Sequence, residues 1–162
     1  MVNFRLLKTG STNAALLGFS QLDQADAVSG RLITVDAGAA GSVVNIGKDG
    51  VFNGQIYIGG WVRGARAVNL YSGIKADGSQ DFDLDVTGTI ETLSGGIVLN
   101  PGDHGVVKGD LIARGTGADI VIQAKHTLEL RGDLLAQDDI LITAGTTVTP
   151  GQVSIYTHGT SH

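Results

Sequence analysis

The sequence predicts an all-β protein, a single-stranded right-handed parallel β-helix (solenoid) of about six coils. The first observation is a doubled phrase: Gly105-Val-Val-Lys-Gly-Asp-Leu-Ile-Ala113 is followed by Thr127-Leu-Glu-Leu-Arg-Gly-Asp-Leu-Leu-Ala136. The second is that Asp119-Ile-Val-Ile-Gln-Ala124 recurs as Asp139-Ile-Leu-Ile-Thr-Ala144. Phrases that recur after roughly 20 residues are typical of solenoids, in which each repeat stacks on the next.

The composition suits narrow coils with tight corners. Apolar residues make up 42% of the 162 residues, yet only 5% are aromatic and 25 are glycine. The formal charge of −5 comes without a basic cluster, which argues against nucleic acid as a partner. Cysteine is absent, so disulfides and thiolate chemistry are excluded.

Two kinds of strand-like phrase alternate from Gly30 onward. The first kind alternates apolar and polar residues: Leu32–Ala37, Val43–Ile46, Gln55–Ile58, Ala67–Leu70, Asp81–Val86, Gly96–Leu99, Asp119–Ile122, Asp139–Ile142 and Gln152–Ile155. The second kind opens with glycine: Gly50–Gly54, Gly60–Gly64, Gly73–Ala76, Gly88–Thr92, Gly109–Ala113 and Gly132–Ala136. The spacing is near a dozen residues in the first half and about 20 or more in the second.

Period-two alternation points one set of side chains into the β-helix. It points Ile120 and Ile122, Ile140 and Ile142, and Val153 and Ile155 to one face. Stacked in register from coil to coil, these residues are predicted to form columns, with Ile120 on Ile140 and Ile122 on Ile142. The corner glycines are expected to supply the positive φ that the bends need.

Residues 1–29 lack this alternation and are expected to form an N-terminal capping segment, while 30–162 form the β-helix as one domain. The segment from Ser11 to Ala27 is expected to hold a short helix or extended chain. The first residues lack the features of a signal peptide, so if the natural protein is secreted, this chain is expected to be an internal piece of it. No stretch approaches about 20 apolar residues, and membrane insertion is not expected.

Several motifs have simple structural explanations. Arg131-Gly132-Asp133 spells an integrin-binding tripeptide, but Lys108-Gly109-Asp110 occupies the same slot one repeat earlier, which predicts a corner. The row Asp81, Asp83 and Asp85 could hold Ca²⁺, although a solvated acidic face is the expected role.

Catalytic, metal and cofactor sites are not expected. The histidines His104, His126, His158 and His162 lack metal-ligand spacing and are predicted to be exposed loop residues. Asp119 and Asp139 fall at equivalent positions and could form a carboxylate pair as in carbohydrate-active β-helices. Strand-opening turns produce the same pattern, so no catalytic residue is predicted.

A binding patch is predicted from the exposed aromatic residues. Its members are Tyr57, Trp61, Arg63, Arg66 and Tyr71. Aromatic faces beside guanidinium groups suit stacking on a glycan or contact with a protein.

The segment from Asp119 to Gly145 resembles the shaft repeats of filamentous haemagglutinin-like and leukotoxin-type filamentous adhesins, in which Asp-Ile-x-Ile-x-Ala alternates with Gly-x-Leu-x-Ala. The match is clear over residues 96–145 and looser over 30–95. This resemblance implies a secreted or surface-attached β-helix of a Gram-negative bacterium, a non-enzymatic shaft that meets a glycan or protein on a host or neighbouring cell.

The segment from Val44 to Gly54 looks like bactofilin, which implies instead a cytoplasmic scaffold that polymerises end to end. Bactofilin coils are shorter and more uniform than those of residues 119–145. A carbohydrate-active β-helix that uses Asp119 and Asp139 is the third alternative.

Overall fold

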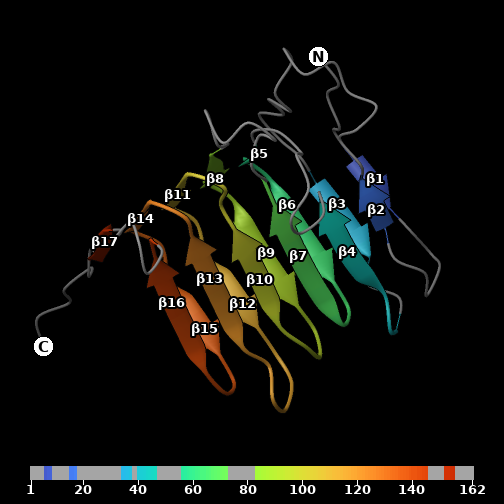
Figure 1. The fold of residues 1–162 in the computed structure, drawn as a ribbon. Helices are drawn as coiled ribbons and strands as arrows, with labels where there is room; N and C mark the ends of the chain where they lie inside the picture. Colours follow the sequence, from blue (N-terminus) through green and yellow to red (C-terminus); the bar gives the residue numbers. More distant parts are fainter. Residues whose placement is uncertain are drawn as a thin grey trace, which may run out of the picture.

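The computed structural model is a parallel β-helix of seventeen short strands in three sheets (Figure 1). It describes residues 40–46, 56–72 and 83–145 in full, and only the backbone of four further strands, Leu6–Lys8, Ala15–Leu17, Thr34–Ala37 and Gln152–Ile155. Each described strand runs parallel to the strands with which it pairs in its sheet. Two sheets contain six strands each, so these strands make six coils, which confirms the predicted fold class.

Each full coil contributes one strand to each sheet, in the order A, B, C. Sheet A contains β1 (Leu6–Lys8), β3 (Thr34–Ala37), β6 (Trp61–Gly64), β9 (Thr89–Thr92), β12 (Leu111–Ala113) and β15 (Leu134–Ala136). Sheet B contains β2 (Ala15–Leu17), β4 (Val43–Ile46), β7 (Ala67–Tyr71), β10 (Ile97–Asn100), β13 (Ile120–Ala124) and β16 (Ile140–Ala144). Sheet C contains β5 (Ile56–Ile58), β8 (Leu84–Val86), β11 (His104–Val107), β14 (Thr127–Leu130) and β17 (Gln152–Ile155).

The core consists of columns of apolar side chains that run along the stack. Val68, Ile97 and Ile120 pair in register and are all fully buried. Along most described strands, buried and partly exposed residues alternate, as the sequence pattern predicts. The predicted pairing of Ile120 with Ile140 and of Ile122 with Ile142 is confirmed.

One predicted column was wrong. Val153 and Ile155 lie on β17 in sheet C, where they pair with Leu128 and Leu130 of β14. They therefore do not continue the column of sheet B. Alternation tells which side chains point inward, but it does not tell which of three sheets a strand joins.

The uneven spacing of the phrases follows from this third sheet. In the first half, successive phrases such as β4 and β5 belong to neighbouring sheets of one coil. Along one ladder the coil that runs from Val68 to its partner Ile97 is longer than the coil that runs from Ile120 to its partner Ile140. Coil length is therefore variable, while the ladder register is kept.

Four of the glycines that open the second phrase type, Gly60, Gly88, Gly109 and Gly132, form a column at the corner between sheets C and A. Gly50 and Gly73, which open the other two phrases, lie outside the described residues. A Cβ atom on Gly132 would lie 1.8 Å from the carbonyl oxygen of Gly109 in the preceding coil. These four glycines are not in the left-handed region, so the predicted positive φ is wrong for this corner. It is confirmed at the corner between sheets A and B, where Gly41, Gly115 and Gly117 have positive φ; among the described glycines, Gly145 is the remaining one. Close backbone approach explains the Gly-Asp corners.

The N-terminal segment contributes two strands to the stack. β1 pairs with β3, and β2 pairs with β4, so both are the end strands of their sheets (Figure 1). The Ala15–Leu17 stretch is therefore extended chain and not helix. The rest of the expected capping segment, 1–29, lies outside the described residues. No helix that could cross a membrane occurs in the part of the chain that the structure describes.

At the opposite end of the fully described coils, the inward positions are open. Ile140 is 45% exposed, whereas Ile120, its register partner in the preceding coil, is fully buried. Leu134 is half-buried, and the outward residues Leu135 and Leu141 are 48% and 50% exposed. This coil therefore presents apolar surface at the end of the stack.

Candidate functional site

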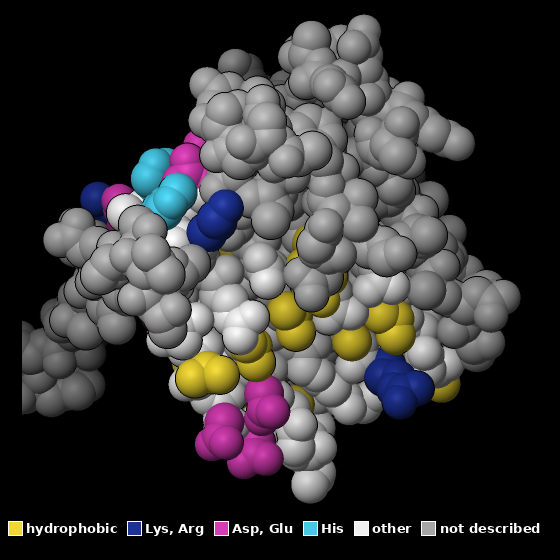
Figure 2. Space-filling view, in the orientation of Figure 1, with side chains coloured by type: hydrophobic (Ala, Val, Ile, Leu, Met, Phe, Trp, Pro, Cys, Tyr) yellow, Lys and Arg dark blue, Asp and Glu magenta, His cyan; other side chains and the backbone are white. Residues whose placement is uncertain are grey.

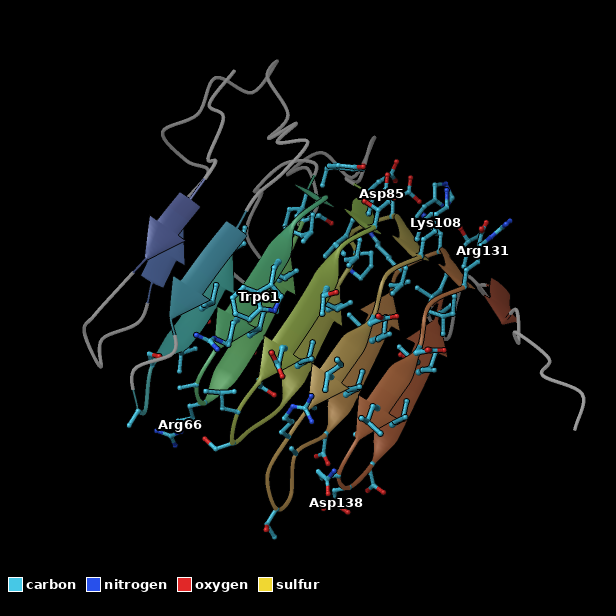
Figure 3. All side chains as sticks on the ribbon, turned by 180° about the vertical axis from the view of Figure 1, so that it is seen from behind. Trp61, Arg66, Asp85, Lys108, Arg131 and Asp138 are labelled. Atoms are coloured by element: carbon cyan, nitrogen blue, oxygen red, sulfur yellow. The ribbon has the colours of Figure 1, made fainter. Side chains whose placement is uncertain are left out.

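The structure distributes the predicted aromatic patch over three sheets. Tyr57 lies on β5 of sheet C, Trp61 and Arg63 lie on β6 of sheet A, and Tyr71 ends β7 of sheet B. Arg66 is exposed at the corner between β6 and β7, away from Trp61 on the sheet face (Figure 3). The five residues therefore do not form one contiguous surface.

Trp61 and Arg63 do form a compact pair. Both point outward from β6, and the guanidinium carbon of Arg63 lies 4.5 Å from the centroid of the Trp61 ring. This distance is typical of a cation–π contact. In the next coil, Arg63 aligns with Glu91, which forms an ion pair of 2.7 Å with Arg114. This outer face of sheet A thus combines an aromatic surface with charges of both signs.

The two tyrosines have separate surroundings. The Tyr57 hydroxyl lies 3.0 Å from Oγ1 of Thr87, and Tyr57 aligns with Asp85 in the next coil. Tyr71 aligns with Asn100, and the two are the last residues of their strands, β7 and β10. Both tyrosines cover their own sheets and are partly exposed.

The Arg131-Gly132-Asp133 tripeptide occupies the corner between β14 and β15. Lys108-Gly109-Asp110 occupies the same corner one coil earlier, and Figure 3 shows Lys108 and Arg131 in succession along this edge. Oδ1 of Asp110 accepts a hydrogen bond of 3.3 Å from the amide of Asp133. Arg131 contacts Glu129. The tripeptide therefore has the corner structure that the repeat predicts.

Asp119 and Asp139 stack as the sequence suggests, together with Asp138. One carboxylate oxygen from each lies within 4.8 Å of the other two, and Figure 3 shows Asp138 at the lower edge of the view. Oδ1 of Asp119 accepts a hydrogen bond of 3.1 Å from the amide of Asp139. This contact is typical of a strand-opening turn, so at least one carboxylate of the pair has a structural role.

A second cluster joins residues that the sequence pattern does not connect. Asp83, Asp103, His104 and His126 meet at the corner where sheet C begins, and Figure 2 shows the two histidines beside carboxylates at the upper edge. The strand register brings these residues together, because Leu84 pairs with Gly105, which pairs with Leu128. The cluster could have been predicted from the sequence only if the length of each coil had been known.

Asp85 is the other acidic residue of this region. Burial and the charge of neighbouring Asp83 raise the pKa of the Asp85 carboxyl above its usual value of 3.8, and Lys108 lowers it in part. Asp83 and Asp85 both project from the outer face of sheet C, while Asp81 lies outside the described residues. The predicted acidic row is thus described at two of its three positions.

Comparisons with known proteins do not extend these observations. No protein-family model, no curated protein and no solved structure matches this chain.

Proposed function

We propose that this chain is a rigid, non-enzymatic shaft segment of a bacterial filamentous adhesin or exoprotein, secreted or exposed at the cell surface of a Gram-negative bacterium. The observation that carries the proposal is the continuity of the three parallel ladders around columns of fully buried residues. Such a stack rises about 4.8 Å per coil and resists bending, because every coil is hydrogen-bonded to its neighbours on three sides.

The corners support a structural role. Polar residues that could be taken for functional motifs bind the backbone of a neighbouring coil: Asp110 binds the amide of Asp133, and Asp119 binds that of Asp139. The unequal lengths of successive coils also favour the filamentous adhesin over bactofilin, because bactofilin coils are shorter and more uniform. The resemblance of residues 119–145 to adhesin shaft repeats agrees with both observations.

The ligand-binding part of the proposal concerns the outer face of sheet A. Trp61 and Arg63 offer a stacked aromatic and cationic surface that suits a sugar ring or an exposed protein segment of a host or neighbouring cell. Trp61 is the single tryptophan of the chain, so its fluorescence reports on this surface. A glycan that binds here should change the fluorescence emission of the natural protein. The Trp61→Ala variant should have no affinity for that glycan.

Lengthening the chain tests the shaft itself. Residues 105–127 make one coil, because Gly105 pairs with Leu128. Four inserted copies should lengthen the particle by about 20 Å in small-angle X-ray scattering without lowering the melting temperature. An insert of the same composition in scrambled order is the control. If the repeated coils lower the melting temperature as much as the scrambled insert, coil stacking does not build a shaft.

End-to-end self-assembly is a second candidate function, favoured by the open end coil. Ile140 and Leu134 present apolar surface on strands whose sheets end there. A second copy stacked on this end would bury that surface and extend the ladders. Electron microscopy of the purified chain distinguishes the two functions: filaments that the Ile140→Asp variant cannot form would support self-assembly, whereas monodisperse short particles support the shaft segment.

A further inference from the structure

Three successive coils bring four metal-ligating side chains to one corner. Asp83 precedes β8, Asp103 and His104 stand at the start of β11, and His126 precedes β14. The parallel register aligns Leu84 with Gly105 and His104 with Thr127. Because the coils stay in step, residues far apart in the chain become neighbours.

The ligand atoms of this corner lie close together. A carboxylate oxygen of Asp83, a carboxylate oxygen of Asp103 and a ring nitrogen of His104 are all within 4.8 Å of one another. Nδ1 of His126 contacts Oδ1 of Asp103, and Nε2 of His104 lies 3.5 Å from the same oxygen. We propose that Asp83, Asp103, His104 and His126 bind a divalent transition-metal ion of the Zn²⁺ class.

The donor set selects the class of ion. Imidazole nitrogen combined with carboxylate oxygen suits Zn²⁺ and its neighbours, whereas Ca²⁺ and Mg²⁺ prefer oxygen alone. Two carboxylates balance the charge of a divalent cation. Four protein ligands match tetrahedral zinc.

The ring geometry is near what one ion requires. Two imidazoles on one tetrahedral zinc have ring centroids about 5 Å apart, from Zn–N bonds of about 2.0 Å. The centroids of His104 and His126 are 6.3 Å apart. The side chains are 51% and 40% exposed, so small rotations toward the ion meet little resistance.

Two imidazoles, and a contact that orients one of them, distinguish this corner from an ordinary acidic cluster. Nδ1 of His104 contacts Oγ1 of Thr127, an arrangement that leaves Nε2 toward Asp103. Oδ1 of Asp83 accepts a hydrogen bond of 3.2 Å from the amide of His104. Supporting contacts of this type orient the histidine ligands in metal sites. The group of Asp119, Asp138 and Asp139 has carboxylates alone, and it supplies the matched control.

An ion at this corner would join three coils of the stack. Because it binds the folded protein and requires all three coils in register, it should raise the melting temperature with increasing metal concentration.

Titration calorimetry of chelator-treated protein with Zn²⁺ tests the site. We expect one ion per chain, with a rise in melting temperature. The His104→Ala/His126→Ala double variant should lose at least about tenfold in affinity, and Thr127→Val should lose about tenfold because His104 is no longer held. Asp138→Asn/Asp139→Asn should bind like the natural protein. Circular dichroism checks that each variant is folded.

Cobalt provides a test that needs no variant. Co²⁺ bound by two imidazoles and two carboxylates in a tetrahedral site should give visible absorption, and Zn²⁺ should displace it. The proposal is overturned if millimolar Zn²⁺ produces neither binding heat nor a thermal shift. Unchanged binding by the folded double variant would equally overturn it, because the ion would then sit elsewhere, with His158 and His162 the remaining histidines.

Discussion

The carbonyl oxygen of Gly88 lies 1.7 Å from the position that a Cβ atom on Gly109 would occupy. The same relationship joins Gly60 with Gly88 and Gly109 with Gly132, at 1.8 Å in both pairs. One corner of the β-helix is therefore a column of glycines in which backbone packs directly on backbone. The glycine of the recurring Gly-Asp phrase is required by this packing.

Gly109→Ala should destabilise the protein by about 2–4 kcal/mol, because backbone atoms surround the added methyl group and cannot rotate away. Urea unfolding followed by circular dichroism measures the free energy of unfolding. Gly117→Ala is the control: it has φ of +72° and nothing within 4 Å of the added Cβ. It should lose only about 1–2 kcal/mol from backbone strain. Equal losses would show that close approach is not the reason for glycine at 109.

Ile120 and Ile140 form a matched pair, because they are register partners with different burial. Ile120→Ala should reduce the free energy of unfolding by about 3–4 kcal/mol, as expected for a fully buried isoleucine. Ile140→Ala should reduce it by about 1–2 kcal/mol, since this side chain already contacts water. The comparison is made by urea unfolding at low protein concentration. A loss for Ile140→Ala as large as that for Ile120→Ala would mean that the end coil is covered in solution.

Substitutions at Asp119 distinguish a structural role of this residue from a catalytic one. Asp119→Ala should lose about 0.5–1 kcal/mol, the contribution of the hydrogen bond from the Asp139 amide. Asp119→Asn keeps an oxygen acceptor and should remain close to the natural stability. If Asp119 instead served catalysis, Asp119→Asn would abolish release of reducing sugar ends from a polysaccharide, which a reducing-end assay detects.

Asp85 should make stability depend on pH in the acidic range. The pKa of the Asp85 carboxyl is raised in the folded state, so the folded protein favours the protonated form. The contribution of Asp85 to the free energy of unfolding is therefore fully present below its usual pKa of 3.8 and is lost as pH rises through the folded-state pKa. Asp85→Asn should therefore raise the urea midpoint modestly at pH 7 and have little effect near pH 3. The measurement is made with chelator present, and NMR titration of the carboxyl gives its pKa directly. A midpoint that falls at pH 7 would contradict the prediction.

Short-range pattern made much of the fold predictable. The alternation in Asp119–Ile122 specified which side chains are buried, and the doubled Gly-Asp phrase specified a corner. The three-sheet arrangement was not predictable in this way. β16 and β17 have similar alternation, yet they join different sheets, because sheet membership depends on how far the chain turns between strands.

The same distinction between short-range pattern and sheet membership applies to the candidate sites. The contact of Trp61 with Arg63 was accessible from sequence, since residues two apart on a strand share a face. The alternation also places Tyr57 and Tyr71 at outward positions, but it does not show that the coil carries them onto other sheets than Trp61.

The order of amino acids alone specifies a stack of parallel coils, its inward-facing residues and the Gly-Asp corners, because each depends on neighbours within a few positions. Contacts between coils depend instead on the folded arrangement. Asp83, Asp103, His104 and His126 are brought together by the ladder of sheet C, along which successive coils differ in length. With no fixed repeat to count by, hydrogen-bond register and core packing set which residues meet across coils.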